Sequence, residues 1–378
     1  MLILAAVLAM LVYGMIAAML GTILPDLSAR FGLTVRQNGT IALSQALGLV
    51  LASLSVGPFI DNEGKKAGLL FGLVLTTVVL VLLPRSRGFR GIAAYLLLLG
   101  LGGGSIVTVA NALGADVSPD KRGTALNLLN LFFGLGGLLT PFISANLLSR
   151  SSVKLCYLVA ALTGATLLVT VATPMPQPTG AQSFVFSDIG DLAGLPALWL
   201  AALLLFLYVA CEVGVWNWLV RHLIAVGIPE SQALNILSLG FALGMLTGRL
   251  VVSQILLSIS AFTVTLSCSL LMLITTYFML QARTPMLAWL MVFLAGLSMA
   301  PVFPTTLAIA AGILPRMTGT ALGIVITSGW LGLAVSSRVI GSLAGGDPKR
   351  LQKALLVLPG MAAVMIAVDL ALRLAIKK

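Results

Sequence analysis

Long apolar runs separated by short polar breaks dominate the pattern of this chain. The runs cover residues 2–25, 39–60, 67–83, 91–115, 124–148, 153–173, 195–220, 231–256, 260–281, 284–313, 319–343 and 352–375. A run of about 20 residues with little charge has the length that an α-helix needs to cross the hydrocarbon core of a bilayer. The pattern therefore predicts an all-α integral membrane protein with twelve transmembrane helices.

The longest stretch with the composition of a loop lies midway along the chain. Residues 174–194 are rich in proline, glycine and serine, which are typical of loops and linkers. This stretch predicts two halves: an N-terminal six-helix half at 1–173 and a C-terminal six-helix half at 195–378, joined by the central linker 174–194.

The two halves also resemble each other in sequence. The tetrapeptide GTAL occurs at 123–126 and again at 319–322, an offset of 196 residues. Several matches in one register indicate an internal duplication. Duplicated six-helix halves predict a pseudo-symmetric transporter with its substrate site near the membrane midplane between them. At the same offset, Gly100-Leu101 matches Gly296-Leu297, Pro119 matches Pro315, and Gly136 matches Gly332.

Composition excludes several other classes of protein. Hydrophobic residues make up 59% and charged residues only 9%, with a mean hydropathy of +1.11, whereas a soluble domain has about 25% charged residues. The 22 Lys and Arg residues are scattered singly or in pairs, without the basic stripe of a nucleic-acid surface. Contact with anionic lipid headgroups is the simpler interpretation of the positive net charge.

Enzyme and cofactor motifs are missing from the sequence. The single histidine, His222, and three cysteines within apolar runs suggest no metal cluster or disulfide framework. Neither H-E-x-x-H nor G-x-S-x-G occurs, and a nucleotide-binding loop is also missing. We therefore expect no cofactor, no metal and no enzymatic activity.

A short polar segment, GPFIDNEGKK at 57–66, falls between the second and third runs. It matches the pattern G-x-x-x-D-x-x-G-[RK]-[RK] and so resembles the major facilitator superfamily. The resemblance implies a latch that holds one closed state on the cytoplasmic side. Asn62 replaces the usual basic residue and Glu63 adds a negative charge, so the latch would be weaker or differently partnered. Asp61 can pair with a cation or cap a neighbouring helix N-terminus. The residues concerned are Gly57, Asp61, Gly64, Lys65 and Lys66, with Arg122 and Arg249, both placed in loops, as partners for the aspartate or as solvated charges.

Few ionisable residues fall inside the predicted helices, where they are costly and are candidates for function. Glu212 lies mid-helix, with Tyr208, Trp216 and Asn217 nearby on the same helix. A carboxylate with aromatic rings and an amide suits a polyol, as a substrate ligand or as a proton site. Asp26 ends the first helix, where it can serve either as an ion-coupling group or as a cap at the membrane interface. Asp369 lies four residues before Arg373, which can neutralise it.

Several helices carry a narrower resemblance, to the fucose-galactose-proton symporter branch and related glucose transporters. The segments are GGGSIVTVANALG, GTALNLLNLFFGLGGLLTP, LYVACEVGVWNWL and APVFPTTLA. The resemblance implies substrate-binding roles for Asn111, Asn127, Asn130 and Glu212, and a coupling role for Asp26. Where the branch carries a helix-four glutamate this chain has Val107, so coupling would use Asp26, Glu212 or a sodium ion.

These observations favour a secondary active transporter that moves a small polar solute, a monosaccharide, by ion-coupled symport with H+ or Na+. An exporter of drugs or lipids is the alternative within the superfamily, and a membrane enzyme or receptor the alternative outside it. We expect a monomer in a bacterial plasma membrane with both termini cytoplasmic. The Lys and Arg count opposes this orientation, because nine fall in inner segments and thirteen in outer ones.

Overall fold

The structure is a computed structural model that describes residues 1–175, 188–345 and 348–377. Each apolar run forms a helical stretch, and this described part of the chain contains no strand. Twelve stretches are long and apolar enough to cross a membrane, which confirms the predicted number. They are Leu2–Phe31, Val35–Glu63, Lys65–Arg85, Phe89–Val117, Pro119–Asn146, Ser152–Ala172, Pro196–Ala225, Glu230–Ile255, Ala261–Gln281, Pro285–Ile313, Thr318–Ala344 and Arg350–Ile376.

The first six stretches contain the long helices α1 to α6. These are α1 (Leu2–Phe31), α2 (Val35–Glu63), α3 (Lys65–Leu82), α4 (Phe89–Val117), α5 (Arg122–Asn146) and α6 (Ser152–Ala172). The short 3₁₀ turns Leu83–Arg85 and Pro119–Lys121 follow α3 and precede α5.

Three of the later stretches are divided into shorter elements. After α7 (Asp188–Ala193) the chain forms α8 (Pro196–Ala225), α9 (Glu230–Asn235), the π-helix η4 (Ile236–Phe241), α10 (Ala242–Ile255), α11 (Ala261–Gln281), α12 (Pro285–Met299), α13 (Val302–Ile313), α14 (Thr318–Ala344), α15 (Pro348–Leu355) and α16 (Val357–Lys377). The break between α12 and α13 falls at Pro301, whose nitrogen has no hydrogen to donate to the helix.

The helix ends follow local sequence signals. Thr34 and Gln37 form a reciprocal capping box at the start of α2. Gly64 ends α2 with a φ of 92°, a conformation that favours glycine, and α3 begins at the next residue. The turn between the second and third spans is therefore a single glycine.

The chain divides into two compact units. Unit 1 contains the described residues of 1–119, 129–186 and 314–327, and unit 2 those of 120–128, 187–313 and 328–378. The units follow the two predicted halves except that the starts of α5 and α14 are exchanged. Both copies of GTAL lie in these exchanged segments. The boundaries at 173 and 195 stay a prediction, and most of the predicted linker 174–194 lies outside the described residues, since 176–187 are not described.

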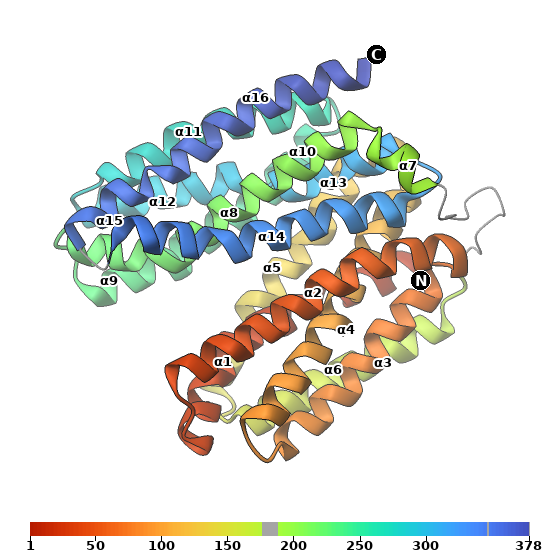
Figure 1. Cartoon of the computed structure of the whole chain (residues 1–378), viewed down its shortest axis with the longest axis horizontal. Coiled ribbons are helices and arrows are strands. Elements are labelled where there is room, and N and C mark those ends of the chain that lie inside the picture. The colour runs from red at the N-terminus through yellow and green to blue at the C-terminus, as the bar shows by residue number, and fades with distance from the viewer. Residues whose placement is uncertain (176–187, 346–347, 378) are drawn as a thin grey trace. The chain divides into compact units, whose positions relative to one another are not determined.

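Close packing within each unit depends on glycine. In unit 1, α4 packs against α2 and α3 (Figure 1). A Cβ atom on Gly48 of α2 or Gly100 of α4 would overlap the backbone of the facing helix. In unit 2, Gly244 of α10 and Gly296 of the facing α12 are equally close to backbone atoms. Small residues permit such contacts in a membrane, where no hydrophobic effect drives the helices together.

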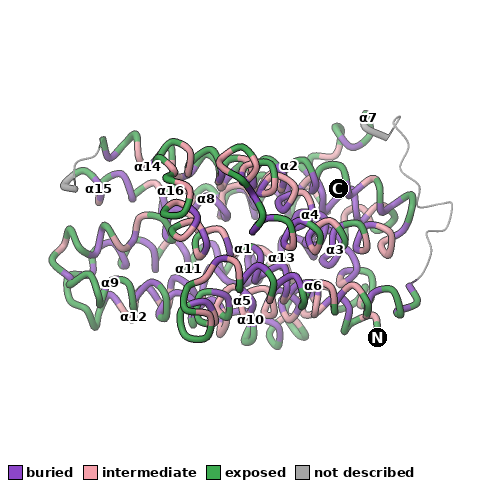
Figure 2. Tube along the Cα trace, turned by 90° about the horizontal axis from the view of Figure 1, so that it is seen from below, coloured by how far each residue is buried: buried purple, intermediate pink, exposed green. Residues whose placement is uncertain are grey.

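The outward sides of many helices carry large apolar residues, and Figure 2 shows buried and exposed positions alternating along the helices. On α2, Leu47, Leu51 and Leu54 are each about half exposed, and on α11 so are Leu270, Ile274 and Phe278. Their spacing of three or four residues places each set on one side of its helix. Exposed leucine and phenylalanine at this density are compatible with lipid, and the protein is an integral membrane protein.

Candidate functional site

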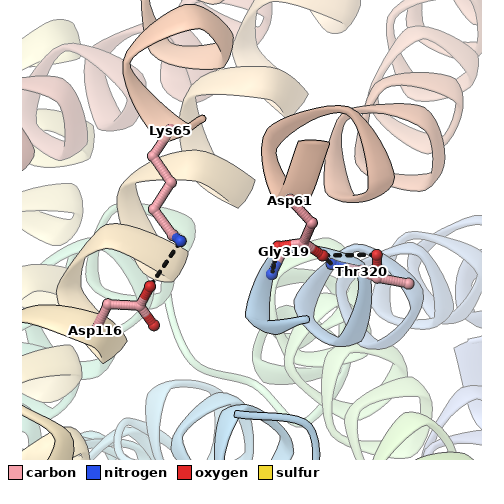
Figure 3. Close-up of polar contacts among 5 residues, drawn as sticks. All are labelled: Asp61, Lys65, Asp116, Gly319 and Thr320. Atoms are coloured by element: carbon pink, nitrogen blue, oxygen red, sulfur yellow. Dashed lines mark hydrogen bonds and ion pairs between the residues drawn. The ribbon is translucent and has the colours of Figure 1, made fainter. Parts of the chain in front are cut away.

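The aspartate of the loop motif binds the start of α14. Both oxygens of the buried Asp61 carboxylate accept hydrogen bonds: Oδ1 from the backbone N–H of Gly319 at 2.9 Å, and Oδ2 from the N–H and the hydroxyl of Thr320, both at 2.7 Å (Figure 3). These N–H groups belong to the first turn of α14, where a helix has unpaired donors and a partial positive charge. Asp61 thus caps a helix 258 residues further along the chain.

Glycine at both sides brings the two backbones together at this contact. A Cβ atom on Gly57 would lie 2.5 Å from the carbonyl oxygen of Gly319, and a Cβ atom on Gly319 would lie 2.6 Å from that of Gly57. A larger residue at either position would separate α2 from the start of α14. Since Asp61 is one turn beyond Gly57, the same separation would lengthen its hydrogen bonds.

The two lysines of the motif bind other parts of unit 1. Lys65 forms an ion pair of 2.6 Å with Asp116 near the end of α4 (Figure 3). Lys66 donates to the carbonyl oxygens of Val171 and Thr173, at 2.8 and 2.9 Å, where α6 ends. A cation at a helix C-terminus complements the unpaired carbonyl groups there. The lysines therefore hold the start of α3 to α4 and α6.

The cations predicted as partners of Asp61 lie elsewhere. Arg122 opens α5 in unit 2, with its guanidinium beside Gly312. The sequence placed Arg249 in a loop, but the structure places it within α10, where it is buried. Its flanking residues Leu-Thr-Gly and Leu-Val-Val continue the apolar helix, so the loop assignment is wrong. The observed partners of Asp61 are instead backbone and hydroxyl groups.

Unit 2 contains the counterpart of the Asp61 contact. The hydroxyl of Thr124, the second residue of the first GTAL, donates to the carbonyl oxygen of Ser253 at 3.0 Å. At the offset of 196 residues, Thr124 corresponds to Thr320 and Ser253 to Gly57. Leu257 stands where the first half has Asp61. The duplication therefore keeps the helix contact in both units but provides a carboxylate in only one.

Two of the predicted asparagines pair in unit 1. Asn130 of α5 donates to the side-chain oxygen of Asn111 of α4 at 2.8 Å, and both residues are buried. Asn111 also donates to the carbonyl oxygen of Val107 at 2.8 Å. Two residues that were each predicted to bind substrate are thus joined by a direct hydrogen bond, and their substrate role stays a prediction.

Glu212 lies in unit 2 among aromatic side chains and one cation. Tyr208 and Trp216, one turn before and one turn after it on α8, lie on the same side of the helix. The Glu212 carboxylate lies beside both of them and, electrostatically, near Arg249 of α10, while the Tyr208 hydroxyl is buried without a hydrogen bond. Trp216 also packs edge-on against Phe241, the last residue of the π-helix, with ring centroids 5.1 Å apart. Single π-helical turns are frequent at functional sites.

Sequence reasoning missed the part that Arg249 plays in this cluster. The Nε of Arg249 donates to the carbonyl oxygen of Ala300 at 3.4 Å, at the break between α12 and α13. One guanidinium therefore contacts the break and also lies near Glu212. The sequence contained a signal for this role, because an arginine inside an otherwise apolar helix needs a polar or charged partner.

Asn127 and Asn217 have other partners. Asn127 of α5 belongs to unit 2 and donates to the hydroxyl of Thr305 on α13 at 3.0 Å. Asn217 donates to the hydroxyl of Ser337 on α14 at 2.6 Å. One residue beyond Trp216, Asn217 is turned by about 100° around the helix axis from the side that carries Glu212. The structure therefore does not bring Asn217 into the Glu212 cluster.

Asp26 occupies the last turns of α1, which extends to Phe31, and its Oδ2 accepts a hydrogen bond from the backbone N–H of Ser152 at 2.9 Å. Ser152 is the first residue of α6. The carboxylate thus caps a helix N-terminus, which is the alternative that the sequence left open beside ion coupling.

Comparison with known proteins gives one consistent assignment. The sequence profile described as Major Facilitator Superfamily matches residues 6–337. The "Glucose/mannose transporter GlcP" of Bacillus subtilis (strain 168) is 23% identical, covering 95% of this chain and 92% of its own. A "Bypass of stop codon protein 6" of Saccharomyces cerevisiae is 20% identical, covering 90% of this chain and 76% of its own.

Solved structures show the same fold. FucP in the outward conformation superposes with a TM-score of 0.85 over 98% of both chains, at 17% sequence identity. The proton:xylose symporter XylE superposes with a TM-score of 0.79 over 97% of this chain and 94% of its own, at 14% identity. With twelve spanning helices, the loop motif and a profile match over most of its length, the chain belongs to the Major Facilitator Superfamily.

Proposed function

We propose that this transporter moves a monosaccharide, by ion-coupled symport in which two six-helix halves alternate in access. The observation that carries the proposal is the Glu212 cluster. A carboxylate flanked by Tyr208 and Trp216 on one side of a helix offers a charge-assisted acceptor for sugar hydroxyls and a ring for the apolar sugar face. The sugars in the names of GlcP and XylE support this substrate class.

Three amides are also proposed to bind the sugar. Asn111 and Asn130 in unit 1 and Asn127 in unit 2 each have hydrogen-bonding groups directed to a neighbouring polar side chain. An amide can donate and accept at once, as a hydroxyl does. We therefore assign these three residues to the sugar, and Asn217 to packing against α14.

Ion coupling is proposed to involve Glu212. Val107 occupies the helix-four position at which the resembled branch has a glutamate, and Asp26 is engaged in capping α6. Glu212 remains the carboxylate that lies beside both the aromatic pair and a buried cation. A proton is the ion that a single carboxylate can exchange without further oxygen ligands, whereas sodium would need several.

Asp61 is proposed as the gate. Its hydrogen bonds to the start of α14 would have to break when α14 moves away from α2, so they would favour the state in which the contact exists. In this role Lys65 and Lys66 would fix the position of the motif within unit 1. We propose that the motif lies on the cytoplasmic side of a bacterial plasma membrane, with both termini on that side, and that the monomer transports.

Uptake into proteoliposomes tests the proposal. Radiolabelled glucose, galactose, fucose and mannose are offered with and without imposed proton or sodium gradients, to the native chain and to Glu212→Gln. Loss of one charge-assisted hydrogen bond should weaken sugar binding by about 10- to 100-fold. Glu230→Gln, an exposed glutamate that opens α9, is the matched control and should transport normally.

The assay separates the two roles of Glu212. If Glu212 binds the sugar, both accumulation and sugar-for-sugar exchange fall in Glu212→Gln. If it carries the proton alone, exchange persists while gradient-driven accumulation is lost. Normal transport by Glu212→Gln would refute the proposed site. A folded native protein that takes up none of the four sugars would refute the substrate class and favour the exporter of drugs or lipids.

A further inference from the structure

A second carboxyl group of unit 2, that of Asp369 on α16, is buried in the membrane-spanning part of the chain. Its side chain is only 3% exposed, and α16 packs along α11, as Figure 1 shows. Asp369 is 12 residues from the start of α16 and 8 from its end. At 1.5 Å per residue these spacings are about 18 and 12 Å, which places Asp369 well inside a hydrocarbon core of about 30 Å.

The two carboxyl oxygens of Asp369 have different surroundings. Oδ2 accepts a hydrogen bond from the Ser269 hydroxyl of α11 at 2.7 Å. Oδ1 is buried and receives no hydrogen bond. Thr265, one turn before Ser269, lies beside the same carboxyl group. Its hydroxyl hydrogen is directed to the backbone carbonyl groups of Ala261 and Phe262, each at 3.2 Å. While it donates there, the Thr265 hydroxyl offers the carboxyl group only its oxygen lone pairs.

No counter-charge compensates the carboxyl group. The sequence predicted that Arg373 would neutralise it, but Arg373 is exposed, and within the described residues the one ion pair is that of Lys65 with Asp116. Arg373 can reach out to the membrane surface, where its charge is hydrated. A carboxylate at position 369 would thus be a charge buried in hydrocarbon with a single hydrogen bond, which is costly.

The other titratable groups on the elements packed against α16 do not change this conclusion. Cys268 of α11 lies beside Asp369, is buried and is neutral as a thiol. On α8, Cys211 contacts the carbonyl oxygen of Leu358, which is 11 residues or about 16 Å from Asp369 along α16. Glu212 follows Cys211 on that helix. The basic residues Arg350 and Lys353 of α15 precede the start of α16, at the far end from Asp369.

We propose that Asp369 is a proton-binding site within the membrane, separate from the Glu212 cluster. In the carboxylic acid form, the O–H group of Oδ1 donates to the Thr265 hydroxyl oxygen while Oδ2 accepts from Ser269. The acid, both hydroxyl groups and the Ala261 carbonyl group are then all paired. The carboxylate form would leave Oδ1 unpaired unless the Thr265 hydroxyl turned away from its backbone acceptors.

The hydrogen-bond chain also provides a route for the proton. The Thr265 hydroxyl can accept a proton from water while it passes its own proton to Oδ1, and it lies one turn from Ala261, the first residue of α11. The start of a membrane-spanning helix lies near the membrane surface, where water can exchange a proton with the chain. The arrangement thus differs from a permanently enclosed hydrogen bond between two helices.

Infrared spectroscopy of the full-length protein in lipid vesicles tests the proposal directly. The difference spectrum between the native chain and Asp369→Asn should contain the C=O stretching band of a carboxylic acid at neutral pH, and the band should shift in D2O. Ser269→Ala removes the hydrogen bond to Oδ2 and should move that band to higher frequency. Ser267→Ala, an exposed serine two residues earlier on α11, is the matched control and should leave it unchanged.

Stability provides a second readout. The asparagine amide can donate to Thr265 and accept from Ser269, as the neutral acid does, so Asp369→Asn should unfold within about 2 °C of the native protein. If the variant does not fold, the Ser269 and Ser267 variants still decide. The proposal is overturned if the difference spectrum contains only carboxylate bands from pH 5 to pH 8, or if Ser269→Ala and Ser267→Ala give identical spectra in the carboxylic acid region.

Discussion

The contact between Asp61 and α14 makes a quantitative prediction for Asp61→Asn. In the native protein Oδ2 accepts from both the N–H and the hydroxyl of Thr320. The asparagine amide keeps one oxygen for the Gly319 N–H, but it places an NH2 group, which cannot accept, where Oδ2 was. Net contributions of hydrogen bonds to a charged group are about 1.5–3 kcal/mol each. Allowing for solvation of the freed groups, we expect the state with the contact to lose about 2–3 kcal/mol. At 1.4 kcal/mol per tenfold, the population without the contact should rise about 30- to 100-fold.

Thiol alkylation measures this population. Ile60 is 1% exposed and lies against Gly319, so a cysteine in the Ile60→Cys variant should react only when α2 and the start of α14 separate. Its alkylation rate in membranes should rise 30- to 100-fold when Asp61→Asn is added. The three native cysteines are buried, which keeps the background low.

A matched variant isolates the hydrogen bonds from the charge. Glu63→Gln removes the same charge two residues away, from an exposed side chain in the same segment, and should change the rate less than threefold. If Asp61→Asn and Glu63→Gln accelerate alkylation equally, the effect is one of net charge and the assigned role of Asp61 as a helix cap is wrong. A rate unchanged by Asp61→Asn would show that these hydrogen bonds do not determine the opening.

Two further predictions concern the same motif. Gly57→Ala places a methyl group 2.5 Å from the Gly319 carbonyl oxygen and should raise the alkylation rate of the Ile60→Cys variant, as Asp61→Asn does. The control is Gly39→Ala on the same helix, which meets no atom within 4 Å and should leave the rate unchanged. Equal alkylation rates in the two alanine variants would contradict the close approach of Gly57 to Gly319. Lys66→Gln loses both charge-assisted hydrogen bonds at the end of α6 and should destabilise the protein by about 2–4 kcal/mol, measured by thermal unfolding. Lys121→Gln changes an exposed lysine and is the control. Equal unfolding temperatures of the two variants would contradict the assigned role of Lys66.

The sequence predicted the spanning helices because their signal is local. A segment of about twenty apolar residues that crosses a bilayer must form an α-helix, because each backbone N–H and C=O group has to be paired within the segment. Asn111 and Asn130 were also selected from the sequence, by resemblance to a known family, but their hydrogen bond to each other was not predicted. The helix boundaries were less predictable: α1 extends six residues beyond the predicted run, and this places Asp26 within the helix instead of at its end.

The partners of single polar residues were not predictable from the sequence. The sequence left Asp61 to pair with a cation or to cap a neighbouring helix N-terminus, and the structure shows the cap. Which helix it caps was not predictable, because the donors are 258 and 259 residues away and no local pattern reveals them. The pairing of Asp369 with Arg373 rested on helical spacing alone, and it fails because a long arginine side chain extends toward water more easily than it folds back into the hydrocarbon. Arg249 was assigned to a loop by analogy with the first half, although the predicted apolar run 231–256 already contained it.

The exchanged segments have a consequence for synthesis on the ribosome. The donors that pair with Asp61 are made 259 residues after it. At about 5–20 residues per second, the carboxylate waits roughly 13–50 s before Thr320 exists. During that interval the third to tenth spans are made while unit 1 lacks its last segment. For most of the time the protein is being made, the Asp61 carboxylate is therefore unpaired and the surface at Gly57 is uncovered. A competing helix N-terminus could bind there most easily during that interval.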